Sequence, residues 1–155
     1  MSVDGWTIAE LLPHTGRAIL LDAVLAGDDT RLTALVTIGP GTEFLGSRGV
    51  PAFVGIEYMA QACGAFSGFT ARRAGTPPRL GFILGTRDYR ATRPWFAVGA
   101  RFVVSVELIY RDDEIGVFDC MIHHETEMIA QARLTVAEPR DVASLIARRN
   151  ATDAR

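Results

Sequence analysis

Glu57 and Gln61 lie four residues apart in an apolar run, so on a helix their side chains share one face. A carboxylate can accept or donate a proton in a reaction, and an amide beside it can orient it. Because a carboxylate is costly to bury without a partner, Glu57 is a candidate general acid or base. The structural alternative is a glutamate that reaches solvent or pairs with an arginine, and the residue types leave both roles open.

His14 is the second candidate for proton transfer. It follows Pro13, which breaks a short helical segment, and imidazole changes charge near neutral pH. It therefore complements Glu57 as a catalytic candidate. The structural alternative is a histidine that caps the chain break and hydrogen-bonds the backbone.

The remaining chemical patterns are weak. His123 and His124 are adjacent on a predicted strand, so their side chains point to opposite faces, and we expect no metal site. Ser47 lacks the Gly-x-Ser-x-Gly surroundings of a hydrolase nucleophile, so we interpret it as an ordinary polar residue of a loop.

The totals describe one domain of 155 residues with a net charge of −2, which indicates neither nucleic-acid nor membrane-surface binding. The longest apolar run is interrupted by Glu57 and is short for a membrane span, and no signal peptide is evident. Cys63 and Cys120 lie in separate apolar segments and are expected to be reduced core thiols. These features predict a cytoplasmic protein.

Residues 50–74 are predicted to form one long helix around which the fold is organised. The run is apolar almost all the way round, which is typical of a helix covered on several sides. Pro51 suits a first helical turn, and Gly75 suits a stop. We expect a sheet to wrap around this helix.

The rest of the chain alternates like β-structure. The predicted elements are a short helix at 7–12, a loop at 39–49, and strands at 18–24, 32–38, 79–89, 101–110, 115–122 and 128–137. Consecutive hairpins predict an α+β fold with an antiparallel sheet. We expect one domain over 1–138 and a polar tail over 139–155 with a helical patch at 142–147. The exposed edges of such a sheet favour pairing with a second subunit.

Several motifs carry a resemblance to a known family. Leu-Leu-Pro-His at 11–14, Ile-Leu-Leu-Asp at 19–22 and Val-Pro-Ala at 50–52, followed by Glu57 and Met-Ala-Gln at 59–61, resemble the motifs of hotdog-fold 3-hydroxyacyl-carrier-protein dehydratases. The runs 51–61 and 80–87 resemble more closely a dehydratase-like (ApeP-like) branch, which is linked to aryl-polyene pigment assembly.

The resemblance covers roughly residues 8–138 and implies a hotdog fold. It implies dehydration of 3-hydroxyacyl thioesters to trans-2-enoyl thioesters, with Glu57 and His14 catalytic. No cofactor is implied, because the substrate is carried on the phosphopantetheine of an acyl carrier protein. The expected assembly is a homodimer, or a heterodimer with another hotdog subunit.

One departure from the family concerns the loop before the helix. Family dehydratases pair the helix carboxylate with a histidine in a Gly-His-Phe-Pro-Gly loop, and here Ser47 occupies that place. Which residue replaces the histidine is open. Ala52 and Phe53, at the predicted helix start, are expected to bind the thioester oxygen through backbone N–H groups. Gln61 and Ser47 complete the predicted substrate site.

Carrier proteins of this kind are acidic, so exposed arginines are docking candidates. Arg72, Arg73 and Arg79 flank the predicted exit of the helix and are assigned this role. The alternative is solvated arginines, since all 16 basic residues are arginine.

Two other functions remain open. The lost loop histidine suits a non-catalytic subunit that supports a catalytic hotdog relative. Hotdog proteins also include acyl thioesterases that act on acyl-carrier-protein or acyl-CoA thioesters with a helix carboxylate.

Overall fold

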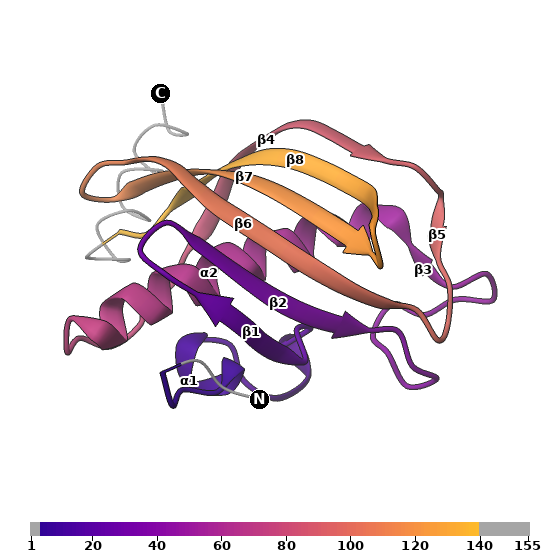
Figure 1. The fold of residues 1–155 in the computed structure, drawn as a ribbon, viewed down its shortest axis with the longest axis horizontal. Helices are drawn as coiled ribbons and strands as arrows, with labels where there is room; N and C mark the ends of the chain where they lie inside the picture. The colour runs from indigo at the N-terminus through magenta and orange to yellow at the C-terminus, as the bar shows by residue number, and fades with distance from the viewer. Residues whose placement is uncertain (1–3, 140–155) are drawn as a thin grey trace, which may run out of the picture.

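A curved antiparallel sheet lies over one long helix in the computed structural model, which describes residues 4–139 (Figure 1). Its six strands run in the order β1-β2-β6-β7-β8-β4. Their bounds are Ala23–Gly27 (β1), Arg31–Thr37 (β2), Phe82–Ala91 (β4), Arg101–Arg111 (β6), Ile115–His124 (β7) and Glu127–Ala137 (β8). The predicted α+β hotdog architecture is confirmed.

The sheet buries one face against the helix. Burial alternates along β2, where Leu32, Ala34 and Val36 are buried and their neighbours are more exposed. Phe118 and Cys120 continue the same buried face on β7. This period of two is what the alternating sequence predicts for a half-buried strand, and it directs the apolar side chains onto the helix.

The central helix, α2 (Gly55–Arg73), begins later than predicted. It is preceded by a 3₁₀ turn, η2 (Ala52–Val54), and by a two-residue strand, β3 (Val50–Pro51), which pairs with β5 (Trp95–Phe96). Pro51 has extended ψ of 137°, because its backbone belongs to this small second sheet rather than to a helical turn. The helix start is therefore fixed by the contact with β5.

The expectation that α2 is covered on several sides is confirmed, but one face of the helix stays open. Phe53, in the turn that leads into the helix, is 69% exposed. Glu57 is exposed, and Ala60 and Gly64 further along are half-buried. These four residues form an open stripe on the side of the helix that the sheet leaves uncovered. Among residues 4–139, neither the sheet nor the N-terminal segment closes over it.

The N-terminal segment packs along α2. Helix α1 (Ile8–Leu11) starts with a capping box, in which the Thr7 N–H donates to the Glu10 carboxylate at 2.8 Å. It lies so close to α2 that a Cβ at Gly68 would be 1.8 Å from the Leu11 carbonyl oxygen. A glycine in the middle of α2 is thus required by the backbone of α1.

The predicted strand at 18–24 starts later, at Ala23. Residues Gly16–Ala18 form a 3₁₀ turn, η1, and the backbone of Ala18 and Leu20 is held by the side chain of Gln61. The first backbone bond to β2 in this stretch is made by the Asp22 N–H, which donates to the Leu35 carbonyl. The run is apolar because Leu21 and its neighbours contact the core. Its composition therefore resembles that of a strand, although the paired strand begins only at Ala23.

The other predicted strands are confirmed in place and order, although β4 begins three residues after the predicted start at 79. The tail at 140–155, with its predicted helical patch, lies outside the described residues, so the domain boundary at 138 stays a prediction. Within residues 4–139, no helix has the length and hydropathy needed to cross a membrane.

Candidate active site

Glu57 lies on the open stripe of α2, in the first turn of the helix. Two cavities meet at this residue. The first has a volume of about 460 Å³ and the second about 330 Å³. Both volumes are in the range of small-molecule sites. Glu57 is exposed rather than buried as the sequence suggested, but it faces two cavities and not an open surface.

The first cavity is mostly apolar. Its walls are formed by the η1 turn, the loop before β3 and the start of α2: Arg17, Ala18, Leu20, Glu43, Phe44, Phe53, Val54, Ile56 and Glu57. Phe44 and Phe53 are 62% and 69% exposed. Two large aromatic side chains in water beside a cavity indicate a surface that binds something apolar.

The second cavity brings together three of the residues singled out from the sequence. Glu57, Gln61 and His14 all line it. Its other walls come from the helix and from the ends of β4 and β8: Pro13, Ala60, Gly64, Arg79, Gly81, Phe82, Ile83, Val136 and Glu138. His14 and Glu57 are 43 positions apart in the chain, and the fold places both on one cavity.

Gln61 is 2% exposed and connects the helix to the N-terminal segment. Its Oε1 accepts from the Leu20 N–H at 2.8 Å, and its Nε2 donates to the Ala18 carbonyl at 2.6 Å. Nε2 also lies 3.4 Å from Glu57 Oε1. The amide therefore positions both the segment at 18–20 and the carboxylate of Glu57.

His14 stands at the wall of the second cavity with its Nδ1 buried. That nitrogen has no hydrogen-bond partner among the described residues. A histidine that only capped the chain break after Pro13 would use a ring nitrogen for the backbone. Within residues 4–139, Nδ1 therefore makes no contact that would support the capping role.

The backbone at the start of α2 differs from the expectation at Ala52. Its N–H donates to the Pro94 carbonyl at 2.9 Å, so it is not free to bind a thioester oxygen. Its carbonyl accepts from the Tyr89 hydroxyl. The ring of Tyr89 lies so close that a Cβ at Gly55 would be 2.3 Å from its hydroxyl oxygen.

Ser47 lies on an exposed turn between two glycines. Gly46 and Gly49 exchange backbone hydrogen bonds of 3.0 and 3.3 Å across it. Ser47 is exposed and lines neither of the two cavities at Glu57, so its predicted place in the substrate site has no support within residues 4–139.

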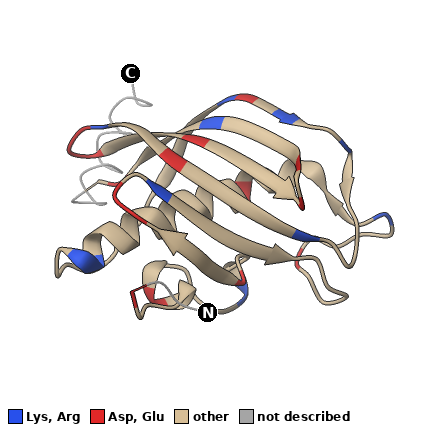
Figure 2. Cartoon of the chain, in the orientation of Figure 1, with Lys and Arg blue, Asp and Glu red and all other residues tan. Residues whose placement is uncertain are grey.

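The three predicted docking arginines do not form one patch. Arg72 Nε donates to the Glu10 carbonyl at 3.1 Å, and Arg73 pairs with Asp29 at 3.1 Å. Figure 2 shows the basic end of α2 close to the acidic turn between β1 and β2. Arg79 is exposed and lines the second cavity instead.

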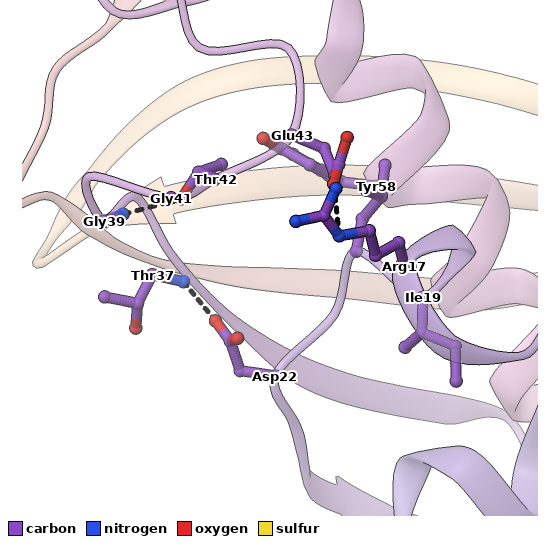
Figure 3. A pocket seen from close by; sticks show the side chains of 10 residues that line it. Arg17, Ile19, Asp22, Thr37, Gly39, Gly41, Thr42, Glu43 and Tyr58 are labelled. Carbon is purple, nitrogen blue, oxygen red and sulfur yellow. Dashed lines mark hydrogen bonds and ion pairs between the residues drawn. The ribbon is translucent and has the colours of Figure 1, made fainter.

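A third cavity of about 450 Å³ shares an ion pair with the lining of the first, and Figure 3 shows this pair among the residues of the third cavity. Arg17 Nε and Glu43 Oε1 lie 3.7 Å apart, and both residues line both cavities. In the wall of the third cavity, the Thr37 N–H donates to Asp22 at 2.5 Å. Sequence reasoning missed Arg17 and Glu43, because neither belongs to a motif or a periodic pattern.

Two tyrosines near the start of α2 are shielded from water. Burial raises the pKa of Tyr58 and of Tyr89 to about 12, with the Asp22 charge a smaller contribution at Tyr58. The Tyr58 hydroxyl has no partner among residues 4–139. The hydroxyl of Tyr89 is used structurally by Ala52.

The two cysteines are free and buried, as predicted. Their Sγ atoms lie 3.7 Å apart between α2 and β7. Burial, with a further contribution from Cys120, raises the pKa of the Cys63 thiol well above its usual value. The described part of the chain holds no group of three histidine, cysteine, aspartate or glutamate side chains that could bind a metal ion.

Distant hotdog structures match this chain in fold. A hypothetical thioesterase from Streptococcus pneumoniae, solved with coenzyme A, matches with a TM-score of 0.60 and 11% identity over 75% of this chain and 84% of its own. The PaaI protein of Escherichia coli matches with a TM-score of 0.55 and 13% identity over 74% and 80%. At these identities the similarity shows the fold alone.

A nearer structure is the dehydratase heterocomplex ApeI:P from Xenorhabdus doucetiae, with a TM-score of 0.89 and 27% identity over 94% of this chain and 98% of the matched chain. No curated protein matches the sequence. The family model described as ApeP-like, ApeP dehydratase, matches residues 6–147. The chain therefore belongs to the ApeP-like dehydratase family.

Proposed function

We propose that this protein dehydrates 3-hydroxyacyl thioesters, carried on an acyl carrier protein, to trans-2-enoyl thioesters in aryl-polyene or fatty-acid biosynthesis. The observation that supports this most is the position of Glu57, an exposed carboxylate where two cavities meet. Membership of the dehydratase family makes the same reaction class the natural assignment. A substrate on a carrier protein, and the free buried thiols, suit the cytoplasm.

The reaction is redox-neutral and needs two proton transfers. The C2–H bond breaks, its electron pair forms the C2=C3 double bond, and the C3–O bond breaks. The hydroxyl leaves as water after it takes a proton from an acid. Glu57 and His14 line the same cavity and are the proposed pair for these transfers. No cofactor is needed for this chemistry.

The carbonyl oxygen of the thioester gains negative charge when the C2 proton leaves. Backbone N–H groups at the start of a helix stabilise such charge. Because the amide of Ala52 is already bonded to Pro94, we assign this role to the next amides of the first turn, at Phe53 and Val54. Gln61 holds Glu57 close to this position.

Carrier docking is proposed to use arginines at the cavity mouths. Arg79 lines the second cavity and is exposed, and Arg17, whose side chain is 92% exposed, lines the first. Arg73 pairs with Asp4 and Asp29 of its own chain, which weakens its attraction for an acidic partner. Arg72 donates to the backbone carbonyl of Glu10. Arg79 is the predicted docking residue that the geometry favours.

The open stripe of α2 supports a second hotdog subunit as partner. Phe44 and Phe53 are exposed beside the cavity, and β4 is an edge strand whose residues Ile83 and Leu84 are exposed. A partner that paired with this edge would satisfy its free backbone groups and cover the aromatic side chains. The similarity to a heterocomplex favours a different hotdog chain over a second copy.

The test is conversion of a 3-hydroxyacyl carrier substrate to the enoyl product by the purified chain, alone and with a co-expressed hotdog dehydratase. Activity that falls in both Glu57→Gln and His14→Gln supports the proposed pair. Absence of any enoyl product under both conditions contradicts the proposal. Mass spectrometry of the intact carrier follows the loss of water.

A second candidate is a subunit without catalysis of its own. The exposed position of Ser47, where family dehydratases have a histidine, supports it. This function predicts no turnover alone, tight association with a catalytic relative, and wild-type rates in a complex that carries Glu57→Gln. Loss of activity in that complex excludes it.

A further inference from the structure

The side chain of Tyr89, on β4, reaches the 3₁₀ turn η2 at the start of α2. Its hydroxyl donates to the Ala52 carbonyl, which also accepts from the Gly55 N–H within the helix. The N–H of Ala52 donates to the Pro94 carbonyl at 2.9 Å. Both backbone groups of Ala52 are therefore held by β4 and by the segment that follows it.

The peptide bond between Ala52 and Phe53 carries the contact with Tyr89 toward the first cavity. This bond is trans and planar, so its carbonyl and its N–H point in opposite directions. Because the Ala52 carbonyl points toward Tyr89, the Phe53 N–H points to the other side of the turn. Ala52 and Tyr89 line neither cavity at Glu57, whereas Phe53 lines the first. The hydroxyl of Tyr89 thus sets the direction of an N–H group to which the proposed function assigns the thioester oxygen.

The same hydrogen bond makes the Phe53 N–H a better donor. A hydrogen bond accepted by a peptide carbonyl polarises the whole amide, and linked hydrogen bonds strengthen one another. Burial raises the pKa of Tyr89 to about 12, so its hydroxyl keeps its proton at neutral pH. Tyr89 therefore remains a donor to the Ala52 carbonyl under the conditions in which the reaction would run.

A bulge in β4 lies at this tyrosine. The pairing of β4 with β8 changes register between Arg87 and Arg90, so that two residues of β4 oppose one residue of β8. Asp88, in the bulge, has a φ of 53°, a left-handed conformation that is uncommon for residues other than glycine. Tyr89 is half-buried between two exposed neighbours. Bulges of this kind re-aim a side chain, and here the side chain that follows Asp88 contacts η2.

Glycine at position 55 leaves room for the hydroxyl. A Cβ there would lie 2.3 Å from the hydroxyl oxygen of Tyr89, and 3.2 and 3.4 Å from side-chain carbons of Ile122 and Phe96. The first distance is too short for any real contact, so a side chain at this position would displace the hydroxyl from the Ala52 carbonyl. Gly55 is therefore part of the same arrangement.

We propose that Tyr89 is a positioning residue for the dehydration, which orients and polarises the Phe53 N–H so that this group stabilises negative charge on the thioester oxygen. The inference rests on the proposed function and adds a residue that does not touch the substrate. Removal of a direct oxyanion donor lowers kcat by about 10²- to 10³-fold. Because Tyr89 acts through such a donor, we expect a smaller loss, on the order of 10-fold, in Tyr89→Phe.

The test measures kcat and KM of Tyr89→Phe in the full chain with its co-expressed hotdog partner. We expect kcat to fall on the order of 10-fold with KM unchanged, because the contact matters most as charge develops on the oxygen. Tyr110→Phe, which removes the hydroxyl of an exposed tyrosine, is the matched control and should keep wild-type kcat. A lower unfolding midpoint of Tyr89→Phe with wild-type kcat would show a structural role alone and would overturn the inference.

Gly55→Ala provides a second variant, because it displaces the hydroxyl of Tyr89 and removes no hydrogen-bonding group. It should also lower kcat on the order of 10-fold. The double variant Gly55→Ala/Tyr89→Phe should have a kcat close to that of the slower single variant, since both changes break the same hydrogen bond. Losses that multiply in the double variant would contradict a shared origin and overturn the inference.

Infrared spectroscopy separates this inference from the proposed reaction. A saturated acyl-pantetheine with an isotope-labelled thioester carbonyl cannot be dehydrated, and a hydrogen bond to its oxygen lowers the carbonyl stretching frequency. We expect a decrease on binding to wild type and to Tyr110→Phe, and a smaller decrease on binding to Tyr89→Phe. This result without any turnover of a 3-hydroxyacyl substrate would support the positioning role and refute dehydration. Equal frequencies in the two variants would refute the positioning role and leave dehydration standing.

Discussion

The side-chain nitrogen of Gln61 lies 3.4 Å from Oε1 of Glu57, one helical turn away. The same nitrogen donates to the Ala18 carbonyl at 2.6 Å, and Oε1 of the amide accepts from the Leu20 N–H. One buried amide thus links the proposed catalytic carboxylate to the N-terminal segment that carries His14. The position of each depends on the other through Gln61.

Replacing Glu57 by glutamine should lower kcat for dehydration by about 10²- to 10⁴-fold, because the amide can neither take nor give the required proton. Stability should change little, since Glu57 is exposed. Steady-state kinetics on a 3-hydroxyacyl carrier substrate measure the effect. Glu107→Gln is the control: it removes a half-exposed carboxylate on β6, which pairs with Arg31 and lines neither cavity at Glu57, and it should retain wild-type rates.

Gln61→Leu should destabilise the fold by about 1–3 kcal/mol, because the Leu20 N–H and the Ala18 carbonyl lose their partner. Urea denaturation measures the free energy of unfolding. Gln131→Leu, on the exposed face of β8, is the matched control and should stay within about 0.5 kcal/mol of wild type. Equal stability of the two variants would mean that Gln61 does not hold the segment.

Gly68→Ala and Gly64→Ala place the same methyl group on α2 in different surroundings. At Gly68 the new carbon would be 1.8 Å from the Leu11 carbonyl oxygen, so α1 must move, at a cost of about 3 kcal/mol or more. At Gly64 the nearest atom is a Leu12 methyl carbon at 3.3 Å, which can shift, and alanine favours the helix by about 1 kcal/mol. Thermal unfolding should separate the two variants clearly, and a similar Tm for both contradicts the close packing of α1.

Stability should fall in alkaline solution between pH 10 and about 12. The folded-state pKa of Tyr58 and of Tyr89 is raised from 10.0 to about 12, so the unfolded chain releases these protons first. The free energy of unfolding is therefore unaffected by these groups below pH 10 and decreases as the pH rises through this window. Denaturant titrations at several pH values measure the slope.

The double variant Tyr58→Phe/Tyr89→Phe should flatten this alkaline slope. Tyr110→Phe removes the hydroxyl of an exposed tyrosine and serves as the control. A slope that is the same in the double variant and in wild type would show that burial of these two hydroxyls does not govern the alkaline transition.

Much of the sheet was predictable from the sequence because β2, β6 and β7 alternate over most of their length and the turns carry strong signals. Asp112 accepts from the N–H groups of Glu114 and Ile115 in the turn between β6 and β7, as turn aspartates do. The start of α2 was less predictable. Proline suits both a first helical turn and an extended residue, and only the pairing of Pro51 with Trp95 decides between them.

Some residues that line the cavities at Glu57 could be singled out from the sequence, but the shape of the site could not. Glu57, Gln61 and His14 follow from residue type and motif. The open stripe on α2 could not be predicted in this way. The sequence of an apolar helix does not show whether one of its faces packs on its own sheet or on a partner. Arg17 and Phe44 escaped notice since they lie in loops, where no periodicity marks a residue as part of a cavity.

Three contacts hold the N-terminal segment against α2. They are the hydrogen bonds of Gln61, the close backbone approach at Gly68, and the hydrogen bond from the Arg72 guanidinium to the Glu10 carbonyl. His14 lies between these attachments. The backbone amides of the N-terminal segment should therefore exchange their hydrogens in the same cooperative unfolding event as α2, rather than as those of an independent loop. Access of substrate to the site would then not depend on independent motion of this segment.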